Sequence, residues 1–352
     1  MTVDLLVVGP ANRDTGGVAR YVTEQQRVLP DDVRTRVFDV RTPRGTGVRR
    51  FLVALLVSVV DALRFPFRRR PDVVHVHSSH RFAFYRAAYY VLVAAYVWRR
   101  PVVIHVHGSA FDEFVSSPPR HVAAIQDVVF GAVDRVIALS DYWKTVLDER
   151  VPGEKVVIVP NAVDPTQYDP GTQTEPPRIV FVSNLIERKG VAELTAAVER
   201  LHENGAPPFE VEIAGDGPLR DRVQRLATDC ENVTYRGYVS EAEKRALLES
   251  GSVFVLPTHA EGLPIALLEG MAGGNAVVST AVGSIPEVLD DDFGVVVGVG
   301  AADELAASLG GLLADPDGTT EMGKRSRRVV ESEYSWPVVS ERLAALYREL
   351  AA

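Results

Sequence analysis

One stretch decides the fold: Pro257-Thr258-His259-Ala260-Glu261-Gly262-Leu263-Pro264-Ile265-Ala266-Leu267-Leu268-Glu269-Gly270-Met271-Ala272. The apolar run before it, residues 253–256, predicts a buried strand, and residues 266–272 predict a helix. A glycine turn lies between them, so backbone N–H groups at the helix start can face an incoming anion. This order of strand, turn and helix predicts an anion site at the end of the strand.

Two carboxylates flank the turn, Glu261 and Glu269, with seven residues between them. We expect Glu261 on the loop above the strand and Glu269 about two turns into the helix. One carboxylate can then hold a sugar hydroxyl and the other a ribose diol, with a diphosphate between them at the helix N-terminus. The alternative is a buried parallel strand and its crossover helix with two solvated glutamates.

The rest of the chain repeats the alternation of short apolar runs and amphipathic segments. Twelve apolar runs predict strands, six in each half: 4–8, 33–40, 73–76, 102–106, 135–139, 156–159, 178–182, 210–214, 233–236, 253–256, 276–279 and 295–297. Short strands that alternate with helices predict an α/β fold with a doubly wound parallel sheet in each half. Ligands of such sheets bind at the carboxyl ends of the strands.

The chain has 352 residues, which suggests two domains rather than one core. Residues 164–177 contain four prolines, a glycine and no hydrophobic period, so they predict a linker. We therefore expect an N-terminal Rossmann-like domain at 1–169 and a C-terminal one at 178–333. The last segment, 336–352, predicts an amphipathic helix that packs back toward the N-terminal domain.

The net charge of −9 is unevenly distributed. Residues 1–170 have 22 Lys and Arg against 18 Asp and Glu, and residues 171–352 have 16 against 29. The basic half suggests an anionic partner such as a membrane surface or a diphosphate lipid, and ordinary surface variation is the alternative. The acidic balance of the whole chain argues against a nucleic-acid partner.

Two apolar segments with flanking arginines, residues 49–70 and 81–100, need weighing as membrane elements. The first is interrupted by Asp61, Arg64 and Pro66, and a spanning helix needs about 20 apolar residues, so we expect neither to span a bilayer. Docking at the membrane interface and burial against the sheet remain the two alternatives.

Cys230 is the only cysteine, so no internal disulfide is possible and a reducing compartment is expected. The N-terminus has no basic region and begins with a strand pattern, which differs from a signal peptide. We therefore expect a cytoplasmic protein, peripheral on the inner face of the cell membrane if the basic half docks there.

Candidate site residues follow the strands of the first half. Gly16 and Gly17 stand directly before a helix, where glycine lets backbone approach a phosphate closely. They do not form a Gly-x-Gly-x-x-Gly fingerprint, which argues against a dinucleotide cofactor.

Histidines end two strands of this half. His105 and His107 point to the same side by period-two alternation, and His107 emerges at the strand end beside glycine. His77 and His80 follow the preceding strand and are expected to line an acceptor pocket. Metal binding by these histidines is possible in principle, but no acidic or cysteine partner has fitting spacing, so we expect no metal.

The second half carries a basic pair between a strand and a helix start, Arg188 and Lys189. An ammonium and a guanidinium can neutralise a leaving pyrophosphate without a metal ion. The triplet Asp290-Asp291-Asp292 lies in a loop rather than at a strand end, and predicts a solvated turn.

These motifs, in this order, resemble those of glycosyltransferase family 4, retaining enzymes with a Glu-x7-Glu signature that use nucleotide sugars. The resemblance covers the chain from Gly16 to Trp336. It implies the GT-B fold, two Rossmann-like domains that face each other across a cleft. Lys189 matches the lysine of the family's Gly-Arg-Leu-x-x-x-Lys-Gly loop, whereas Asn184 stands where the family places arginine. Asparagine can hydrogen-bond a phosphate but supplies no charge.

The resemblance also implies roles for individual residues. Its catalytic residues would be His107, Lys189 and Glu261, with Glu287 supporting a helix start. Its donor-binding residues would be Gly16, Gly17, Asn184, Arg188, Gly215, Gly217, Gly237, Tyr238, Val239, Gly262, Leu263, Pro264, Ile265 and Glu269. Its acceptor-binding residues would be His77, His80 and Ser109.

The function implied is a retaining hexosyltransferase that moves a hexose from a nucleoside-diphosphate sugar to a glycan, carried on a lipid or at the cell surface. No cofactor and no divalent metal are expected, since the nucleotide sugar is a substrate. The expected partners are this donor, the acceptor and an anionic membrane surface. Two alternatives stay open: a nucleotide-sugar-binding subunit with little activity of its own, and another GT-B enzyme such as an epimerase.

Overall fold

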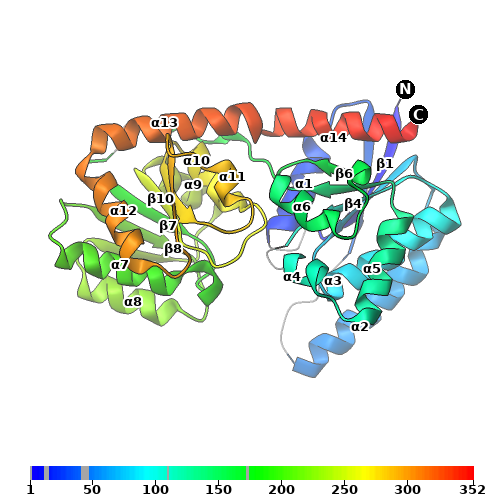
Figure 1. Cartoon of the computed structure of the whole chain (residues 1–352), viewed down its shortest axis with the longest axis horizontal. Helices are drawn as coiled ribbons and strands as arrows, with labels where there is room; N and C mark the ends of the chain where they lie inside the picture. The colour runs from blue at the N-terminus through cyan, green and yellow to red at the C-terminus, as the bar shows by residue number, and fades with distance from the viewer. Residues whose placement is uncertain (1, 12–15, 41–46, 109–110, 172–173) are drawn as a thin grey trace. The chain divides into compact units, whose positions relative to one another are not determined.

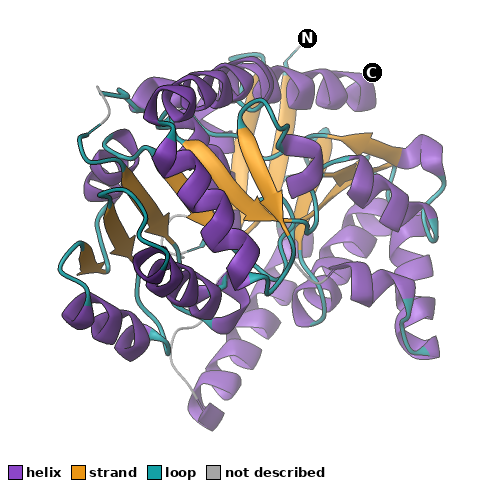
Figure 2. Cartoon of the chain, turned by 60° about the vertical axis from the view of Figure 1, so that its left-hand side comes forward, coloured by secondary structure: helices purple, strands orange, loops and turns teal. Residues whose placement is uncertain are grey.

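The computed structural model describes residues 2–11, 16–40, 47–108, 111–171 and 174–352, and only the backbone of residues 49–51. The chain divides into two compact units. Unit 1 comprises Met1–Asn161 and Trp336–Ala352, and unit 2 comprises Ala162–Ser335. Each unit contains one parallel six-stranded sheet with helices on both faces (Figures 1 and 2).

The sheet of unit 1 has the strand order β2-β1-β3-β4-β5-β6. Its strands are β1 Val3–Gly9, β2 Val33–Asp39, β3 Val73–Ser78, β4 Val102–Val106, β5 Arg135–Ala138 and β6 Val156–Ile158. Its helices are α1 Gly17–Val28, α2 Gly47–Arg64, η1 Phe65–Phe67, α3 Phe82–Leu92, η2 Val93–Trp98, α4 Phe111–Ser116, α5 Arg120–Ala132, α6 Asp141–Asp148, η3 Gly153–Lys155 and α14 Trp336–Ala351.

The sheet of unit 2 has the order β12-β11-β10-β7-β8-β9. Its strands are β7 Arg178–Val182, β8 Glu210–Ala214, β9 Val233–Gly237, β10 Val253–Leu256, β11 Ala276–Thr280 and β12 Gly294–Val297. Its helices are η4 Pro165–Gln167, η5 Glu187–Lys189, α7 Val191–Glu203, α8 Arg220–Asp229, α9 Glu241–Glu249, α10 Ile265–Ala272, α11 Ile285–Val288, α12 Ala302–Ala314 and α13 Pro316–Glu333. Helices α7, α8 and α12 cover one face of this sheet, and α9, α10 and α13 cover the other (Figure 1).

Burial explains why these segments form central strands. Every residue of β4, β10 and β11 is buried, because helices cover both faces of each sheet. A strand buried on both faces is a short continuous apolar or β-branched run, which is the pattern that the sequence contains. The sequence-based prediction of an α/β fold with two doubly wound parallel sheets is therefore confirmed.

The strand orders also determine where a ligand can bind. In unit 1 the order reverses between β1 and β3, and in unit 2 it reverses between β7 and β10. The connections leave these two strand pairs in opposite directions, which opens a crevice at their carboxyl ends. The loops after β1, β3, β7 and β10 are therefore the first places to look for a site.

Three local expectations need adjustment. Residues 81–100 form α3 and then a π-helical segment, η2, rather than one regular helix. The predicted linker at 164–177 contains the short helix η4, whose N-cap Asp164 accepts a hydrogen bond from the Thr166 backbone N–H. The apolar segment 49–70 forms α2 and η1, and most of the large apolar side chains described in α2 are exposed. Phe65 of η1 is the exception in this segment, because it is buried against Phe38 of β2.

Candidate functional site

A charged cluster of Arg188, Lys189 and Glu261 lies at the strand-order reversal of unit 2. Lys189 Nζ donates a hydrogen bond to Glu261 Oε1, and Arg188 Nη1 lies 3.4 Å from the same oxygen. Arg188 Nη1 also donates to the Ala260 carbonyl at 2.6 Å. The side chains of Lys189 and Glu261 are only 12% and 10% exposed, so this pair is largely desolvated, whereas the Arg188 side chain is 39% exposed.

The loops after β7 and β10 hold this cluster together through their backbones. Gly190 has φ of 72°, and a Cβ there would lie 1.7 Å from the Pro257 carbonyl oxygen, so only glycine fits this crossing. Thr258 Oγ1 and the His259 backbone N–H both donate to the Arg188 carbonyl, at 2.9 and 2.7 Å. Thr258 Oγ1 also lies 3.3 Å from Glu261 Oε1. The position of the cluster is therefore set by contacts between two neighbouring strand ends.

Glu269 forms a second ion pair, separate from the charged cluster. Its two carboxylate oxygens accept hydrogen bonds from Lys244 Nζ at 2.9 and 3.0 Å. Both side chains are buried, with 4% exposed for Glu269 and 11% for Lys244, and Lys244 also pairs with Glu241. Glu269 lies in α10 and Lys244 in α9, so this pair fixes one helix against the other.

The first turn of α10 connects the two carboxylates. Gly262, Leu263 and Pro264 are buried, Ile265 is half-buried, and Pro264 is the N-cap. The Gly262 carbonyl accepts from the Ser284 backbone N–H at 3.0 Å, which holds the turn against the loop after β11. Glu287 lies in α11, the short helix that follows this loop. The turn is thus rigidly supported at the carboxyl end of β10.

The loops after β8 and β9 carry five predicted residues. Gly215 has φ of 142°, and a Cβ there would lie 1.8 Å from the Ser183 carbonyl oxygen. Gly217 approaches the Leu185 backbone in the same way, whereas Gly237 has open space around it. The first two glycines are therefore required by close packing onto the loop after β7. Tyr238 is 82% exposed, Val239 is half-buried, and Asn184, in the loop that these glycines contact, is exposed.

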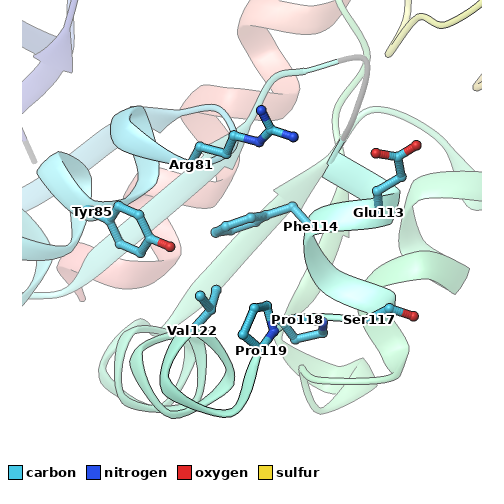
Figure 3. Close-up of a pocket in the computed structure, with 8 residues that line it drawn as sticks. All are labelled: Arg81, Tyr85, Glu113, Phe114, Ser117, Pro118, Pro119 and Val122. Carbon is cyan, nitrogen blue, oxygen red and sulfur yellow. The ribbon is translucent and has the colours of Figure 1, made fainter.

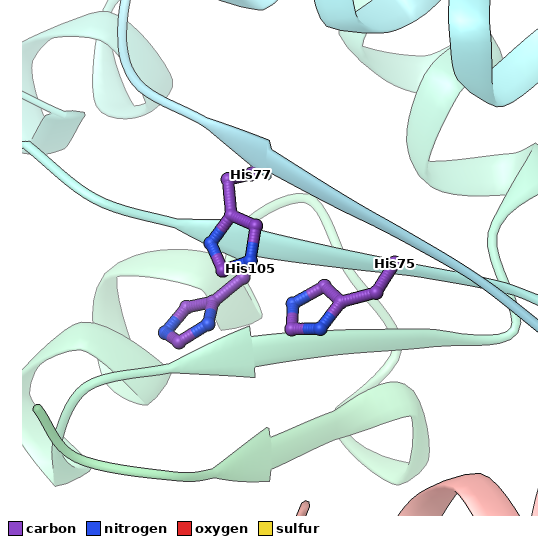
Figure 4. Close-up of side chains that lie close together, drawn as sticks. All are labelled: His75, His77 and His105. Carbon is purple, nitrogen blue, oxygen red and sulfur yellow. The ribbon is translucent and has the colours of Figure 1, made fainter. Parts of the chain in front are cut away.

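Unit 1 contains a histidine cluster of His75, His77, His105 and His107 (Figure 4 shows the first three). His75 and His77 lie in β3, His105 lies in β4 and His107 follows it, with all four side chains on the same face of the sheet. Ring centroids are 3.9 Å apart for His105 and His107, and 4.2 Å apart for His75 and His77. His77 Nδ1 and His107 Nε2 share a hydrogen bond of 2.9 Å.

Residues from α1 and α14 close over the histidine cluster. Gln25 Oε1 lies 3.0 Å from His77 Nε2, and Tyr347 Oη lies 2.6 Å from His75 Nδ1. Gln25 Nε2 donates to Tyr347 Oη at 2.7 Å. The ring of Tyr21 lies within 5.7 Å, centroid to centroid, of three of the histidine rings. The chain end thus packs into the core of unit 1.

Burial keeps these imidazoles uncharged. Desolvation lowers the pKa of His107 to about 3, and desolvation together with His107 lowers the pKa of His75 to about 3. The pKa values of His77 and His105 lie well below the usual 6.5, for the same main reason. His107 is therefore neutral near pH 7 and can donate or accept a hydrogen bond but supplies no charge.

His75, His77 and His105 form the one group among the described residues whose geometry could hold a metal ion, with ligand atoms within 4.8 Å of one another. Both nitrogens of His77 are already hydrogen-bonded to protein groups. The His105 nitrogens and His75 Nε2 have no hydrogen-bond partner. The sequence-based argument considered metal binding by the strand-end histidines and set it aside, because no acidic or cysteine partner has fitting spacing. The structure brings three histidines of two adjacent strands together without such a partner.

The remaining predicted residues of unit 1 surround the ends of β1 and β3. Gly16 is the N-cap of α1 with φ of 131°, Gly17 begins the helix, and both are exposed. His80 is half-buried, with its Nδ1 3.2 Å from Ser79 Oγ. Ser109 lies outside the described residues. A Cβ on Gly16 would meet no atom within 4 Å, so the backbone is open on that side.

The described residues of unit 1 line two cavities in this region. One, of about 190 Å³, lies at the carboxyl ends of β1 and β3, and its lining includes Val8, Val76, His77, Ser79, Arg86 and Tyr90. The other, of about 260 Å³, lies between α3, α4 and α5, and its lining includes Arg81, Tyr85, Glu113, Phe114 and Pro119 (Figure 3). Each combines apolar walls with an arginine.

Solved structures first define the class of protein. The chain resembles a sucrose-phosphate synthase from Thermosynechococcus elongatus with a TM-score of 0.77 and 17% identity over 99% of both chains. It resembles Anabaena Alr3699/HepE in complex with UDP-glucose with a TM-score of 0.73 and 16% identity, over 99% of this chain and 100% of that one. At such identities the likeness concerns the fold alone, and the fold is GT-B, two doubly wound α/β units in one chain.

Two family models then define the family. The model described as "Glycosyltransferase Family 4" matches residues 15–167, and the one described as "Glycosyl transferases group 1" matches residues 166–329. Together they match the chain from residue 15 to residue 329. The chain belongs to glycosyltransferase family 4.

Curated relatives match part of the chain. The alpha-maltose-1-phosphate synthase of Mycolicibacterium smegmatis is 31% identical over an alignment of 253 positions, which covers 63% of this chain and 64% of that protein. A GDP-mannose-dependent monoacylated alpha-(1-6)-phosphatidylinositol monomannoside mannosyltransferase of Corynebacterium glutamicum is 30% identical over 53% of this chain and 54% of that protein. The aligned part spans less than two thirds of the length of these relatives.

Sequence reasoning missed Lys244, Gln25 and Tyr347. Lys244 is one of only five lysines in the chain, and this scarcity was the one signal that could have singled it out. Gln25 and Tyr347 reach the histidine cluster from α1 and α14, which lie far apart in sequence, and no local pattern predicts that contact.

Proposed function

We propose that this chain is a retaining hexosyltransferase that moves a hexose from a nucleoside-diphosphate sugar to a glycan acceptor carried on a lipid. The observation that carries the proposal is the charged cluster at the strand-order reversal of unit 2. Two cations there meet one carboxylate beside the first turn of α10. Cations and a helix N-terminus at one place can bind a diphosphate and a carboxylate can bind sugar hydroxyls.

In this proposal unit 2 (domain 178–333) binds the donor. Lys189, Arg188 and the backbone amides of Gly262–Ile265 hold the diphosphate, and Asn184 donates one further hydrogen bond to it. Glu261 holds the donor sugar. Glu269, already positioned by Lys244, accepts hydrogen bonds from the ribose. The loops that contain Gly215, Gly217, Gly237, Tyr238 and Val239 flank the nucleobase.

The ion pair between Lys189 and Glu261 has a defined part in donor binding. Without donor, each of these two groups neutralises the other in a largely desolvated position. A bound diphosphate offers Lys189 more negative charge, and the sugar hydroxyls offer Glu261 hydrogen-bond donors. The donor thus replaces one ion pair by two sets of contacts, and neither charge is left uncompensated.

Unit 1, which contains most of the expected domain 1–169 and the helix at 336–352, binds the acceptor. Neutral His107 hydrogen-bonds a donor-sugar hydroxyl, and the amides of Gly16 and Gly17 approach the phosphate. His77, His80 and Ser109 contact the acceptor. The cavity of about 190 Å³ beside His77 supports this role, since its apolar wall and Arg86 suit a molecule with both lipid and phosphate parts.

Retention follows a front-face reaction, for which no nucleophile of the enzyme is needed. The bond between the anomeric carbon and the diphosphate oxygen breaks, and the acceptor hydroxyl oxygen forms its bond on the same face. The acceptor proton passes to the leaving phosphate oxygen, so the products are the glycoside and the protonated nucleoside diphosphate. Lys189 and Arg188 stabilise the charge that grows on that diphosphate.

The lipid acceptor is supported by the name of one relative, which acts on a phosphatidylinositol mannoside. No described helix is long and apolar enough to cross a membrane. We propose that the enzyme is cytoplasmic, binds the anionic inner face of the membrane as a peripheral protein, and needs neither a cofactor nor a divalent metal ion. Nucleic acid is not among its partners.

A donor and acceptor screen tests the proposal. The chain would be incubated with UDP- and GDP-hexoses and with lipid extract of the source cells, and products identified by mass spectrometry. The expected result is a lipid one hexose heavier, whose anomeric configuration by NMR matches that of the donor. An inverted product contradicts retention, and transfer of no sugar to any lipid contradicts the proposed reaction.

Asn184 supports a second candidate, a nucleotide-sugar-binding subunit with little activity of its own. An exposed asparagine supplies one charge fewer than arginine at a phosphate. This candidate predicts that the screen detects donor binding without turnover. Replacement Asn184→Arg would then raise activity from near zero, whereas in an active enzyme it changes turnover modestly.

A further inference from the structure

The orientation of α2 is the reverse of that of an ordinary surface helix. Its outward side carries an apolar stripe, defined by Val48, Leu52, Leu55, Leu56, Val59 and Leu63, with exposed fractions between 47% and 75%. These positions are three or four residues apart, so they form one continuous face of the helix. Surface helices usually turn such a face to the core.

The opposite side of α2 faces the protein and carries smaller side chains. The half-buried residues there are Ala54, Val57, Ser58, Val60, Asp61 and Ala62. The Ala62 carbonyl accepts a hydrogen bond of 2.6 Å from Tyr89 Oη of α3. The inward side is therefore already packed on α3. The apolar stripe is not a core face that has been left uncovered by a small rotation.

Exposed apolar side chains are concentrated in this part of the molecule. Of the sixteen large apolar residues that are exposed among those described, eight lie between Val48 and Phe67, and Phe67 is 89% exposed. Phe82, Tyr96 and Val97 of the neighbouring segments α3 and η2 are exposed as well. Only Tyr238 and Val299 of this set lie in unit 2. A concentration of this kind marks an interaction surface.

Charge identifies the partner. The end of α2 and the residues after it carry exposed Arg64, Arg68, Arg69 and Arg70, and Asp61 is the one acidic residue in positions 47–71. An anionic bilayer offers hydrocarbon to the stripe and phosphate to these arginines at one surface. A second copy that paired through the same face would cover the stripe but bring the same arginines, with Asp61 as the one acidic residue of its segment 47–71.

We propose that the apolar stripe of α2 inserts into the interfacial layer of an anionic membrane, with the helix parallel to the surface. At 18 residues, α2 is about 27 Å long and lies flat rather than across the bilayer. The apolar stripe, rather than the arginines alone, supplies the affinity. The inference deepens the proposed function, because it brings the acceptor-binding unit to the surface where a lipid-linked acceptor lies.

Vesicle flotation tests the inference with the full chain. Vesicles of phosphatidylcholine alone and with about one third phosphatidylglycerol would be mixed with the wild type and three variants. The stripe variant is Leu52→Ser/Leu56→Ser/Leu63→Ser, and the charge variant is Arg68→Glu/Arg69→Glu/Arg70→Glu. The matched control is Ile125→Ser/Val128→Ser, which removes exposed apolar residues of α5 in the same unit.

We expect the wild type and the α5 control to float with anionic vesicles. The stripe variant should bind at least about tenfold more weakly at any salt concentration, because its hydrocarbon contact is lost. The charge variant should lose about fivefold per arginine at low salt, and this loss should shrink as salt rises. Circular dichroism checks that each variant is folded.

Several results would overturn the inference. These are a wild type that binds neither kind of vesicle, a stripe variant that floats as well as the control, and light scattering that shows a dimer which the stripe variant alone abolishes. Nucleotide binding, followed by calorimetry with UDP and GDP, separates this inference from the proposed function. A wild type that floats but binds neither nucleotide refutes the transferase and not the membrane surface.

Discussion

The two units have the same fold but bury different polar groups. In unit 2, Lys189 pairs with Glu261 and Lys244 pairs with Glu269, so charges are buried in pairs. In unit 1, four imidazoles lie along β3 and β4, and burial lowers their pKa values. Unit 2 therefore offers charged groups, and unit 1 offers hydrogen-bonding groups without charge.

This difference in charge depends on whether each unit places an opposite charge beside a buried one. A buried charge is tolerated only beside an opposite charge with good hydrogen bonds, which the loops of unit 2 provide. Around the histidine cluster the near neighbours are Gln25, Tyr21 and Tyr347, which are polar and uncharged, so the imidazoles lose their protons instead. The charged unit therefore suits a diphosphate, and the neutral unit suits sugar hydroxyls.

The largest effect is expected where a buried pair in unit 2 is broken. Replacement Lys244→Met leaves the Glu269 carboxylate buried without this cation, and we expect a loss of about 3–5 kcal/mol in the free energy of unfolding. Urea denaturation measures it. Lys324→Met, which breaks an exposed pair with Glu321, is the matched control and should change stability by less than about 0.5 kcal/mol.

A double variant separates the lost pair from lost packing. Lys244→Met/Glu269→Gln removes both charges and should recover most of the stability, since an uncharged amide is cheaper to bury than a carboxylate. If the double variant is no more stable than Lys244→Met, the pair is not what holds α9 to α10.

The next effect concerns turnover at the charged cluster. Lys189→Ala and Glu261→Gln should each lower turnover at least about a hundredfold, or about 2.7 kcal/mol in the barrier, with the fold unchanged. Matched controls are Lys324→Ala and Glu210→Gln, which remove the same groups from pairs outside the site. Product formation is measured by mass spectrometry. Near-normal rates in either variant refute the roles given to these two residues.

Some features of the two units could be predicted from the sequence and others could not, for a physical reason. The central strands are predictable because a strand buried on both faces is a short continuous apolar or β-branched run, and such runs are visible locally. The proximity of Lys189 and Glu261 is also predictable in outline, since both follow strands and ligands bind at the carboxyl ends of such strands.

Contacts between distant elements were not predictable. Tyr347 reaches His75 across 272 positions of sequence, and Lys244 reaches Glu269 between two helices, so their pairing depends on packing rather than on a local pattern. The direction of α2 was not predictable either. Its hydrophobic period fits a helix packed on the sheet as well as one turned outward, and only the side-chain exposures distinguish the two.

A smaller effect on the free energy of unfolding is expected when the pH is lowered, because unit 1 buries uncharged histidines. In the unfolded chain the pKa of histidine is about 6.5, whereas in the folded chain the pKa values of His75 and His107 are about 3. Below pH 6.5 the unfolded state therefore binds protons that the folded state does not, and stability falls as the pH falls. For one such histidine the loss at pH 5 is about 2 kcal/mol.

Urea unfolding at pH 7.5 and at pH 5 measures this loss. Carboxylates also titrate in acid, so the comparison that matters is between variants. His75→Gln should reduce the difference between the two pH values, and His121→Gln, which removes an exposed histidine of the same unit, should leave it unchanged. Equal pH sensitivity in all three proteins would mean that the histidine cluster does not carry the effect.

The smallest effect is expected from metal removal. In the proposed function, Lys189 and Arg188 stabilise the charge of the leaving diphosphate in unit 2, which is the part that a divalent ion would otherwise take. In unit 1, both nitrogens of His77 are hydrogen-bonded to His107 and Gln25, and binding a metal would break one of these bonds. Dialysis against EDTA should therefore change turnover by less than about twofold, because no contact to the reacting groups is lost.

Two measurements make this last test specific to each unit. Activity that disappears with EDTA and returns with Mg²⁺ or Mn²⁺ would place a metal at the diphosphate. The two cations of the charged cluster would then not be enough to stabilise the leaving group. A fall in the unfolding temperature with EDTA, seen in the wild type and absent in His105→Gln, would place a metal in the histidine cluster. The difference between a charged unit 2 and an uncharged unit 1 holds only if neither of these two EDTA effects is observed. A cation bound to the histidine cluster would add charge to a site that burial keeps uncharged.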